Sequence, residues 1–546
     1  MSENVKIIPL GGFGEFGKNM MVIAVEDDWI IIDSGSAMPE DGMLGIDVVI
    51  PDFSILLENK EKLRGIILTH GHEPHLGSLP YLLEQLSLPV YGTKMTLAMA
   101  GFYLKEHYFY DNVEMKTVKP GERFRLGKLT CELIHACHDV YGASGVAIRT
   151  SLGWVINTGD FKIDYTPYQD ENTDLDRLAA LGHQGVFALL ADSANAEHQG
   201  ATISESVVAE KLAGIIEEAE ARVVVHLYVT DLLRIQQVLD IAEKTERRVT
   251  LFPEQLNAVI ARAESAGVLK YREFKGRGRR GRSRKPDLVV VASVPGQPYL
   301  GPLSGESGHR FQIEKNDTII LTGSYHAGTE KTLIRTIDML YRQGAEEVHE
   351  LISLGEISSH GGQEELKLLY SLTKPKFIIP IHGEHRHLVQ AKEIALNLGW
   401  ADQNVFVLEN GEVLRLEANQ GNISEQVPAE KVMVDGLGVG DIGNVVLKDR
   451  RILAKDGVVI VVITVDKANK TPVKLPQIES RGFLPAHESE QVFLEAMAQL
   501  NQYLIKQNLK SADAATIRNM VRENISRFLS EQTRRRPMVL PVILFV

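Results

Sequence analysis

The chain has 546 residues, which is too long for a single hydrophobic core, so two to four domains are expected. Its apolar share of 44% and charged share of 24% are those of an ordinary globular protein. The formal net charge of −13 opposes nucleic-acid binding by the molecule as a whole. Any such contact must therefore come from local basic patches.

Three further features concern the compartment. The only cysteines, Cys131 and Cys137, exclude a disulfide scaffold and favour a reducing environment. The first residues, MSENVKIIPLGG, hold no basic segment leading into an apolar stretch, so no secretory signal is expected. The longest apolar runs, such as GVVIVVITV at 457–465, are too short to cross a bilayer. A cytoplasmic protein with no membrane partner is predicted.

Residues 1–204 alternate short apolar runs with glycine-rich turns, and many of the runs end in a polar cluster. This pattern predicts stacked sheets whose strand ends carry a site. The runs are VKIIPLGG, MMVIAV, WIIIDSGS, RGIILTHGH, PVYGT, LTCELIHACH, GVAIRTS, GWVINTGD and VFALLADS.

The pattern changes in residues 205–355, where longer helical stretches alternate with strands such as RVVVHLY and RVTLF. This predicts an inserted α/β domain, after which residues 356–418 return to the first domain. The polar residues 419–431 are predicted to be a linker. Residues 432–546 are predicted to form an interaction module, with strands VVLKDRRIL and VVIVVITV, two helices and a closing stretch VLPVILFV.

Three histidines, His70, His72 and His75, follow the apolar run GIIL within six positions. Imidazole is the commonest metal ligand in proteins, and three imidazoles on one turn favour a metal site over ordinary packing. Further along, His138, Asp160 and His382 also follow apolar strands, in the stretches CHDVYG, NTGDFK and IPIHGEH.

The order HGHEPH, a lone histidine, NTGDFK and IHGEH resembles the metallo-β-lactamase superfamily, and within it the β-CASP nucleases of the ribonuclease J family. Stretches along the whole chain share the resemblance, among them LGGFGEFGKNM, LLADSANAE, SHGGQEELKLL and DGLGVGDIGNVVLKDRRIL. It implies an α/β fold: a metallo-β-lactamase αββα sandwich, an inserted β-CASP α/β domain and a small C-terminal α+β module.

The resemblance also implies ligands for two metal sites. Site one would use His70, His72, His138 and Asp160. Site two would use Asp160 as a bridge together with His75, His382 and an aspartate, but Pro74 stands where that aspartate is expected. A proline side chain has no lone pair and no charge, so a weak or vacant second site is expected. In the alternative reading, water or another side chain fills the place. His135 is expected to be a strand residue.

The phosphate-binding segment of the family has the pattern His-x-Ser-Gly-His, and this chain reads Glu356, Ile357, Ser358, Ser359 and His360. Ser358 and His360 match the pattern. Glu356 replaces a histidine by a carboxylate, which repels phosphate, and Ser359 replaces a glycine.

Two acidic residues match the family outside that segment. Asp192 matches a carboxylate that assists proton transfer, so His360 and Asp192 are the candidate catalytic pair. Asp33 matches a carboxylate that supports the metal site from behind its ligands. The glycine-rich loop of the family is poorly kept in SVPGQPYLG at 293–301.

These departures cluster in the site, which resembles the weakly active second ribonuclease J paralogue of Gram-positive bacteria. The implied function is a metal-dependent ribonuclease of reduced activity, acting 5′ to 3′ and internally on messenger and ribosomal precursors. Zn²⁺ is the expected ion, with Mn²⁺ or Mg²⁺ as alternatives. The expected partners are RNA, a second copy of the chain in a dimer or larger oligomer, an active ribonuclease J paralogue and the RNA degradosome.

Two other readings remain open. One is a scaffold or regulatory subunit that binds RNA and an active paralogue without cutting. The other is a small-molecule metallo-hydrolase, which the inserted domain and terminal module disfavour. The basic stretch FKGRGRRGRSRKP at 274–286 is either a solvated loop or an arm that follows an RNA backbone.

Overall fold

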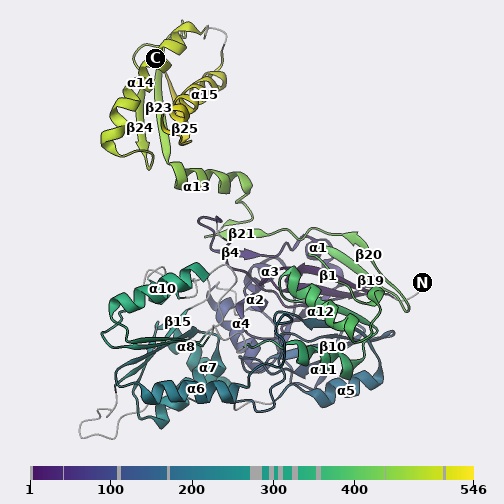
Figure 1. Cartoon of the computed structure of the whole chain (residues 1–546). Coiled ribbons are helices and arrows are strands. Elements are labelled where there is room, and N and C mark those ends of the chain that lie inside the picture. Colours follow the sequence, from purple (N-terminus) through teal and green to yellow (C-terminus); the bar gives the residue numbers. More distant parts are fainter. Residues whose placement is uncertain are drawn as a thin grey trace. The chain divides into compact units, whose positions relative to one another are not determined.

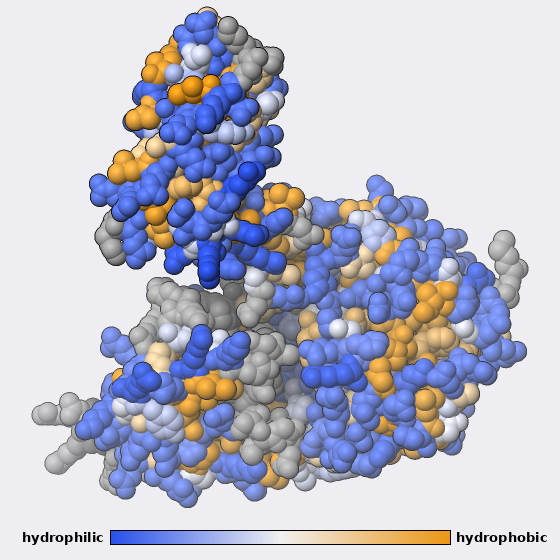
Figure 2. All heavy atoms as spheres, turned by 45° about the horizontal axis from the view of Figure 1, so that its top comes forward, coloured by the Kyte–Doolittle hydropathy of each residue, from blue (hydrophilic) through white to orange (hydrophobic). Residues whose placement is uncertain are grey.

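The computed structural model divides the chain into two compact units, residues 1–38 with 47–432 and residues 39–46 with 433–546. Hydrophilic residues cover most of the face seen in Figure 2, in keeping with the negative net charge. No helix among the described residues is long and apolar enough to cross a membrane. The structure describes residues 4–40, 42–106, 112–168, 172–270, 286–293, 300–304, 311–322, 330–351, 358–436, 438–507, 509 and 512–546.

Two sheets face each other in the first unit and enclose an apolar core (Figure 1). The inner strands of the two sheets are buried throughout because uninterrupted runs of β-branched and other apolar residues supply both faces. The eight-stranded sheet has the order β20 (Gly421–Gln426), β19 (Glu412–Leu416), β1 (Val5–Gly11), β2 (Met20–Val25), β3 (Asp28–Ile32), β5 (Leu63–Ile67), β6 (Val90–Gly92) and β7 (Met115–Thr117). The six-stranded sheet has the order β18 (Phe377–Ile381), β12 (Val186–Asp192), β11 (Gly153–Asn157), β10 (Ser144–Thr150), β9 (Leu129–His135) and β8 (Arg123–Leu126).

Helices cover the outer faces of both sheets, which gives the expected αββα order. On the six-stranded sheet these are α5 (Leu175–Gln184), α11 (Gln363–Thr373) and α12 (His385–Asn397), and on the other α3 (Leu79–Gln85) and α4 (Lys94–Glu106). Short elements complete this part: β4 (Val48–Ile50), α1 (Ser54–Glu58) and α2 (Glu73–Leu76).

The chain leaves this sandwich after β12 and returns to it through β18 and β19. β18 pairs in parallel with β12, so that Asp192 lies beside Ile381, and β19 pairs antiparallel with β1. The part of the chain between β12 and β18 forms a separate parallel sheet with its own core. Its order is β14 (Val249–Phe252), β15 (Leu288–Ser293), β13 (Val223–Tyr228), β16 (Thr318–Leu321) and β17 (Glu347–Glu350).

The helices of this inserted part are amphipathic, and α6 and α7 begin at Asp or Ser residues that suit a helix N-terminus. Of the basic stretch at 274–286, residues 274–285 lie outside the described residues. The helices are α6 (Glu205–Glu218), α7 (Leu232–Lys244), α8 (Gln255–Ala266), α9 (Gly301–Ser304) and α10 (Glu330–Gln343).

In the second unit, the sheet β24 (Gln477–Arg481), β23 (Val458–Val465), β25 (Met538–Phe545) packs with α14 (Ala486–Lys506) and α15 (Ala514–Thr533) around a separate apolar core. The stretch VVLKDRRIL at 445–453, expected to be a strand, is instead part of α13 (Asn444–Asp456). Its Leu, Lys, Arg and Ala residues favour a helix, and Gly443 and Gly457 bound it. The short strands β21 (Val432–Asp435) and β22 (Gly438–Val439) pair with each other.

Part of the segment predicted to be a linker, 419–431, is a strand in the structure. Residues 421–426 form β20, which pairs antiparallel with β19 at the edge of the eight-stranded sheet. Five of its six side chains are exposed, and the segment therefore reads as polar loop in the sequence although its backbone is hydrogen-bonded.

Candidate metal centre

The predicted metal ligands and the predicted catalytic residue Asp192 come from the ends of five strands that meet at one edge of the sandwich. Asp33 and the predicted ligand His382 have left-handed backbone conformations with φ of 61° and 54°. Non-glycine residues in this region are typical of functional sites, where surrounding contacts hold them. The side chains are His70, His72 and His75 after β5, His138 after β9, Asp160 after β11, Asp192 at the end of β12 and His382 after β18.

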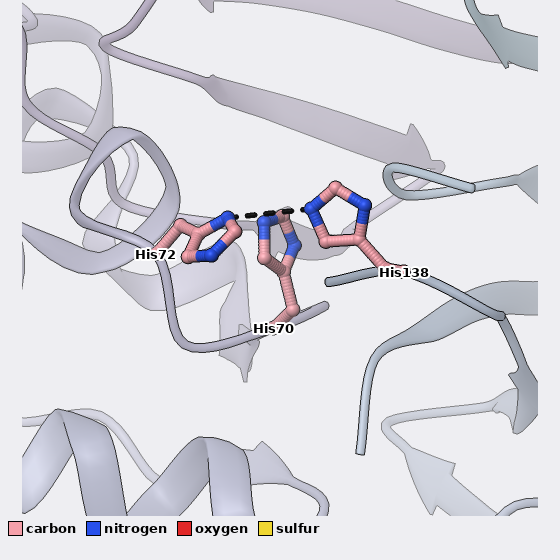
Figure 3. Close-up of side chains that lie close together, drawn as sticks. All are labelled: His70, His72 and His138. Atoms are coloured by element: carbon pink, nitrogen blue, oxygen red, sulfur yellow. Dashed lines mark hydrogen bonds between the residues drawn. The ribbon is translucent and has the colours of Figure 1, made fainter. Parts of the chain in front are cut away.

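His70, His72 and His138 turn their rings toward one another (Figure 3). His72 Nδ1 lies 3.3 Å from His138 Nε2, the pair joined by the dashed line. His135 is the last residue of β9 and belongs to none of the candidate ligand groups found among the described residues, as expected from its spacing.

Three of the histidines use Nδ1 to hold their ring in place, which leaves Nε2 to face the centre. His138 Nδ1 donates to the carbonyl of Ser359 at 2.9 Å, and His75 Nδ1 lies 2.8 Å from Asp33 Oδ2. His70 Nδ1 lies 3.0 Å from the Thr69 hydroxyl. Such supporting hydrogen bonds fix the tautomer that a metal-binding imidazole needs. Asp33 thus contacts a predicted ligand, His75, through the ring nitrogen that faces away from Asp160.

Asp160 stands in the middle of the candidate ligands. Its Oδ2 lies 3.6 Å from His70 Nε2, 3.2 Å from His75 Nε2 and 4.0 Å from His138 Nε2. Its Oδ1 lies 2.8 Å from His382 Nδ1. One carboxylate thus reaches both sets of histidines, which is the position a bridging ligand requires.

Pro74 stands in the first turn of α2, where the missing N–H breaks no helical hydrogen bond. Its carbonyl accepts a hydrogen bond from Asn19 N at 2.9 Å. Gly35 permits this close approach, because a Cβ there would lie 1.6 Å from the Pro74 oxygen. The neighbouring Glu73 accepts from the Ser36 hydroxyl at 3.4 Å and belongs to none of the candidate ligand groups found among the described residues. This turn therefore supplies no carboxylate to the centre.

The candidate catalytic pair is also assembled. His360 Nδ1 lies 2.8 Å from Asp192 Oδ2 and 3.9 Å from Asp160 Oδ2. The backbone that carries His360 is anchored at two points, where Asn195 Nδ2 donates to the His360 carbonyl at 3.1 Å and Lys162 Nζ lies 3.4 Å from the Ser358 carbonyl. Glu356 and Ile357 lie outside the described residues.

Burial and neighbouring charge give the histidines different protonation. Burial lowers the pKa of His70 well below its ordinary value and that of His72 to about 4, so both are neutral, the form that binds metal. Burial would also lower the pKa of His75, but the carboxylates of Asp160 and Asp33 raise it to about 10. For His360, Asp192 outweighs burial in the same way, and its pKa rises to about 9.

The residues present fit a divalent cation. His70 Nε2 and His72 Nε2 are buried and make no hydrogen bond among the described residues, although buried polar atoms are normally paired. Burial would raise the pKa of Asp160, but His382 and the other histidines hold it well below its ordinary value, so a carboxylate faces these nitrogens. Neutral imidazoles around an ionised carboxylate are the donor set of Zn²⁺ and related ions.

Two carboxylates near the centre were missed by sequence reasoning. Asp139 Oδ1 lies 3.1 Å from His138 Nε2 and 3.3 Å from His72 Nε2. Asp231, which precedes α7, groups with His72 and Asp139. Burial, followed by the charge of Asp139, raises the pKa of Asp231 to about 8. The sequence could have revealed only Asp139, because it adjoins the predicted ligand His138. Asp231 gave no such signal, because it is distant in sequence.

Family models match four consecutive parts of the chain. They are described as Metallo-beta-lactamase superfamily (residues 13–146), Ribonuclease J, beta-CASP domain (220–340), Zn-dependent metallo-hydrolase RNA specificity domain (347–407) and Ribonuclease J C-terminal domain (445–546). A protein named Ribonuclease J2 from Bacillus subtilis (strain 168) is 36% identical over 552 residues, covering 100% of this chain and 99% of its own. The chain belongs to the ribonuclease J family.

Other matches agree with this assignment. Ribonuclease J 2 of Staphylococcus aureus (strain MRSA252) is 35% identical over 99% of this chain and 98% of its own length. A solved structure of a protein of unknown function from Enterococcus faecalis V583 covers 76% of this chain with a TM-score of 0.51 and 16% identity, which concerns the fold alone. The predicted family, its second-paralogue character and the fold class are thereby confirmed. Membership in the superfamily implies a divalent metal site and a hydrolytic nuclease architecture.

Proposed function

We propose that this chain is a metal-dependent ribonuclease of low activity that degrades RNA 5′ to 3′ and also cuts it internally, on messenger and ribosomal precursors in the cytoplasm. The observation that carries the proposal is the convergence of imidazoles on Asp160, which lies between 2.8 and 4.0 Å from His382, His75, His70 and His138. The names of the relatives agree with RNA as substrate.

We assign His70, His72, His138 and Asp160 to the first metal site. His75, His382 and the bridging Asp160 form the second, which lacks a carboxylate at Pro74 and is the weaker. A bound Zn²⁺, or Mn²⁺ or Mg²⁺ in its place, activates water and neutralises phosphate charge. One filled site and one weak site would give slow turnover.

The protein's own contribution is proton transfer and phosphate positioning. Asp192 engages Nδ1 of His360, so the other ring nitrogen serves the substrate and can donate a proton to the leaving oxygen. Ser358 and Ser359, with Glu356 and Ile357, occupy the phosphate segment. Glu356 carries a charge that repels RNA there, a second reason for low activity.

We further propose that the first domain comprises residues 1–204 and 356 to the end of β20, that 205–355 form the β-CASP domain and that 432–546 form an interaction module. The module joins copies of the chain into a dimer or larger oligomer and joins this chain to an active ribonuclease J paralogue, within an RNA degradosome.

The second candidate is a scaffold that binds RNA and the active paralogue without cutting, and Pro74 favours it because no carboxylate from α2 reaches the centre. One assay separates the two functions. The purified chain is incubated with 5′-monophosphorylated RNA and Mn²⁺ or Mg²⁺, beside a His70→Ala, His72→Ala double variant. Slow cleavage that the double variant lacks supports the ribonuclease. Equal rates in both samples mean a contaminating nuclease and leave the scaffold.

A further inference from the structure

Three buried atoms beside the first metal site could bind a metal and make no hydrogen bond among the described residues: His70 Nε2, His72 Nε2 and Asp139 Oδ1. The His70 side chain is completely buried. Buried polar atoms are normally paired, so three unpaired ones of complementary type in one place indicate a missing common partner. Two of these atoms belong to the ligands already assigned, and the third belongs to a residue with no assigned role.

The distances around Asp139 are those expected within one coordination sphere. Its Oδ1 lies 3.1 Å from His138 Nε2 and 3.3 Å from His72 Nε2. Ligands bonded to one zinc ion at about 2.0–2.1 Å in a tetrahedron are separated by about 3.3–3.4 Å. Asp139 Oδ1 is therefore placed as the histidine nitrogens are placed.

A simple supporting role fits these observations less well. An oxygen that orients an imidazole accepts a hydrogen bond from it, whereas Asp139 Oδ1 accepts none among the described residues despite its closeness to two rings. The residue is also held by other contacts, because Leu233 N donates to its carbonyl at 3.3 Å and Ser359 hydrogen-bonds to its side chain. Those contacts fix the carboxylate near His72 and His138.

We propose that Asp139 is an additional metal ligand of the first site, beyond the set that the family resemblance implies. This inference rests on the metal centre proposed above. The anionic oxygen joins imidazoles in a donor set suited to Zn²⁺ or Mn²⁺. The first site then has two carboxylates, Asp139 and the shared Asp160. The second site has only the shared Asp160, because Pro74 stands where a further carboxylate is expected.

The test uses the full chain, freed of metal with a chelator and titrated with Co²⁺, whose visible spectrum reports its ligands. Asp139→Asn keeps the shape and hydrogen-bonding capacity of the side chain but removes the anionic donor. Asp139→Cys offers a thiolate, which gives a charge-transfer band in the near ultraviolet only when sulfur is bound to cobalt. Asp174→Asn is the matched control, because the Asp174 side chain caps α5 by accepting from Arg177 N and belongs to none of the candidate ligand groups found among the described residues. Melting of the metal-free proteins checks folding.

We expect Asp139→Asn to weaken Co²⁺ binding at least about ten-fold, Asp174→Asn to leave it unchanged and Asp139→Cys to show the thiolate band that the wild type lacks. Wild-type affinity in Asp139→Asn, or no new band in a folded, cobalt-loaded Asp139→Cys, overturns the assignment of Asp139 and leaves the metal centre intact. A wild-type chain that takes up no Co²⁺ overturns the centre itself and the inference with it.

Discussion

Replacing Glu205 by glutamine should destabilise the first unit strongly. Glu205, the first residue of α6, is 2% exposed, and its two oxygens face two cations at the junction of the sandwich and the inserted domain. Lys162 Nζ lies 2.9 Å from Oε1, and Arg234 Nη1 lies 3.0 Å from Oε2. The variant removes the charge that Lys162 and Arg234 share, and the next carboxylate to Lys162 is Asp164, whose Oδ2 lies 3.9 Å from Lys162 Nζ.

Removing one partner of a buried ion pair costs about 3–5 kcal/mol, because the other charge stays buried without compensation. Glutamine keeps one hydrogen-bond acceptor, so we expect about 3 kcal/mol for Glu205→Gln. The matched control is Glu364→Gln, which breaks a pair with Lys367 whose side chains are 57% and 41% exposed. The control should change stability by no more than about 0.5 kcal/mol.

Urea unfolding followed by tryptophan fluorescence measures this effect. All three tryptophans, Trp29, Trp154 and Trp400, lie in the first unit, so their signal reports that unit. An unfolding curve of Glu205→Gln that coincides with the wild type, or with Glu364→Gln, would refute the reasoning.

The same network predicts a pH dependence. Burial would raise the pKa of Glu205, but Arg234 and Lys162 outweigh burial and hold it below its ordinary value of 4.5. A lowered pKa in the folded state means that the stabilisation is complete above pH 4.5 and is lost as the pH falls through the folded value. The stability difference between wild type and Glu205→Gln should therefore be constant near neutrality and shrink in acid.

Three further predictions concern the centre and the thiols. Pro74→Asp should raise the metal content from one ion per chain toward two, with a modest gain in turnover, measured by elemental analysis and RNA cleavage; unchanged stoichiometry would contradict the role given to position 74. His360→Ala should slow cleavage about 10²–10⁴-fold and Asp192→Asn less, with metal content unchanged; a parallel loss of metal would make His360 a ligand instead. Cys131, whose pKa burial raises to about 12, and the equally buried Cys137 should react with a thiol reagent only after unfolding, and fast labelling of the native chain would show that the sandwich opens readily.

The inner strands of the sandwich could be predicted because each is an uninterrupted apolar run, and a run buried on both faces leaves little choice of structure. The segments 445–453 and 421–426 could not. In the first, the valines at its start suggested a strand although Val445 is 74% exposed at the first turn of a helix. In the second, the exposed polar side chains concealed a strand whose stability comes from backbone pairing.

Among the site residues too, some could be predicted from the sequence and others could not. His70, His72 and His75 were found because they are close in sequence, and Asp160 because the family order places it. Asp139 was missed although it adjoins His138, because its meaning depends on His72, which a distant loop brings to 3.3 Å. Local sequence shows which side chains could ligate, and only packing shows which of them meet.

Positions 139 and 74 determine where carboxylates lie at the metal centre. A double variant tests whether the two positions act on the same ion. If Asp139 serves the first site and position 74 the second, Pro74→Asp should raise occupancy of the second site equally in wild type and in Asp139→Asn, because sites with separate ligands respond independently. Asp160 contacts histidines of both sites, so the comparison is made at Co²⁺ concentrations that fill the first site in both backgrounds. Co²⁺ titration of the four proteins measures the interaction. If the gain from Pro74→Asp disappears in Asp139→Asn, the two positions serve one ion, and the centre is not divided as described.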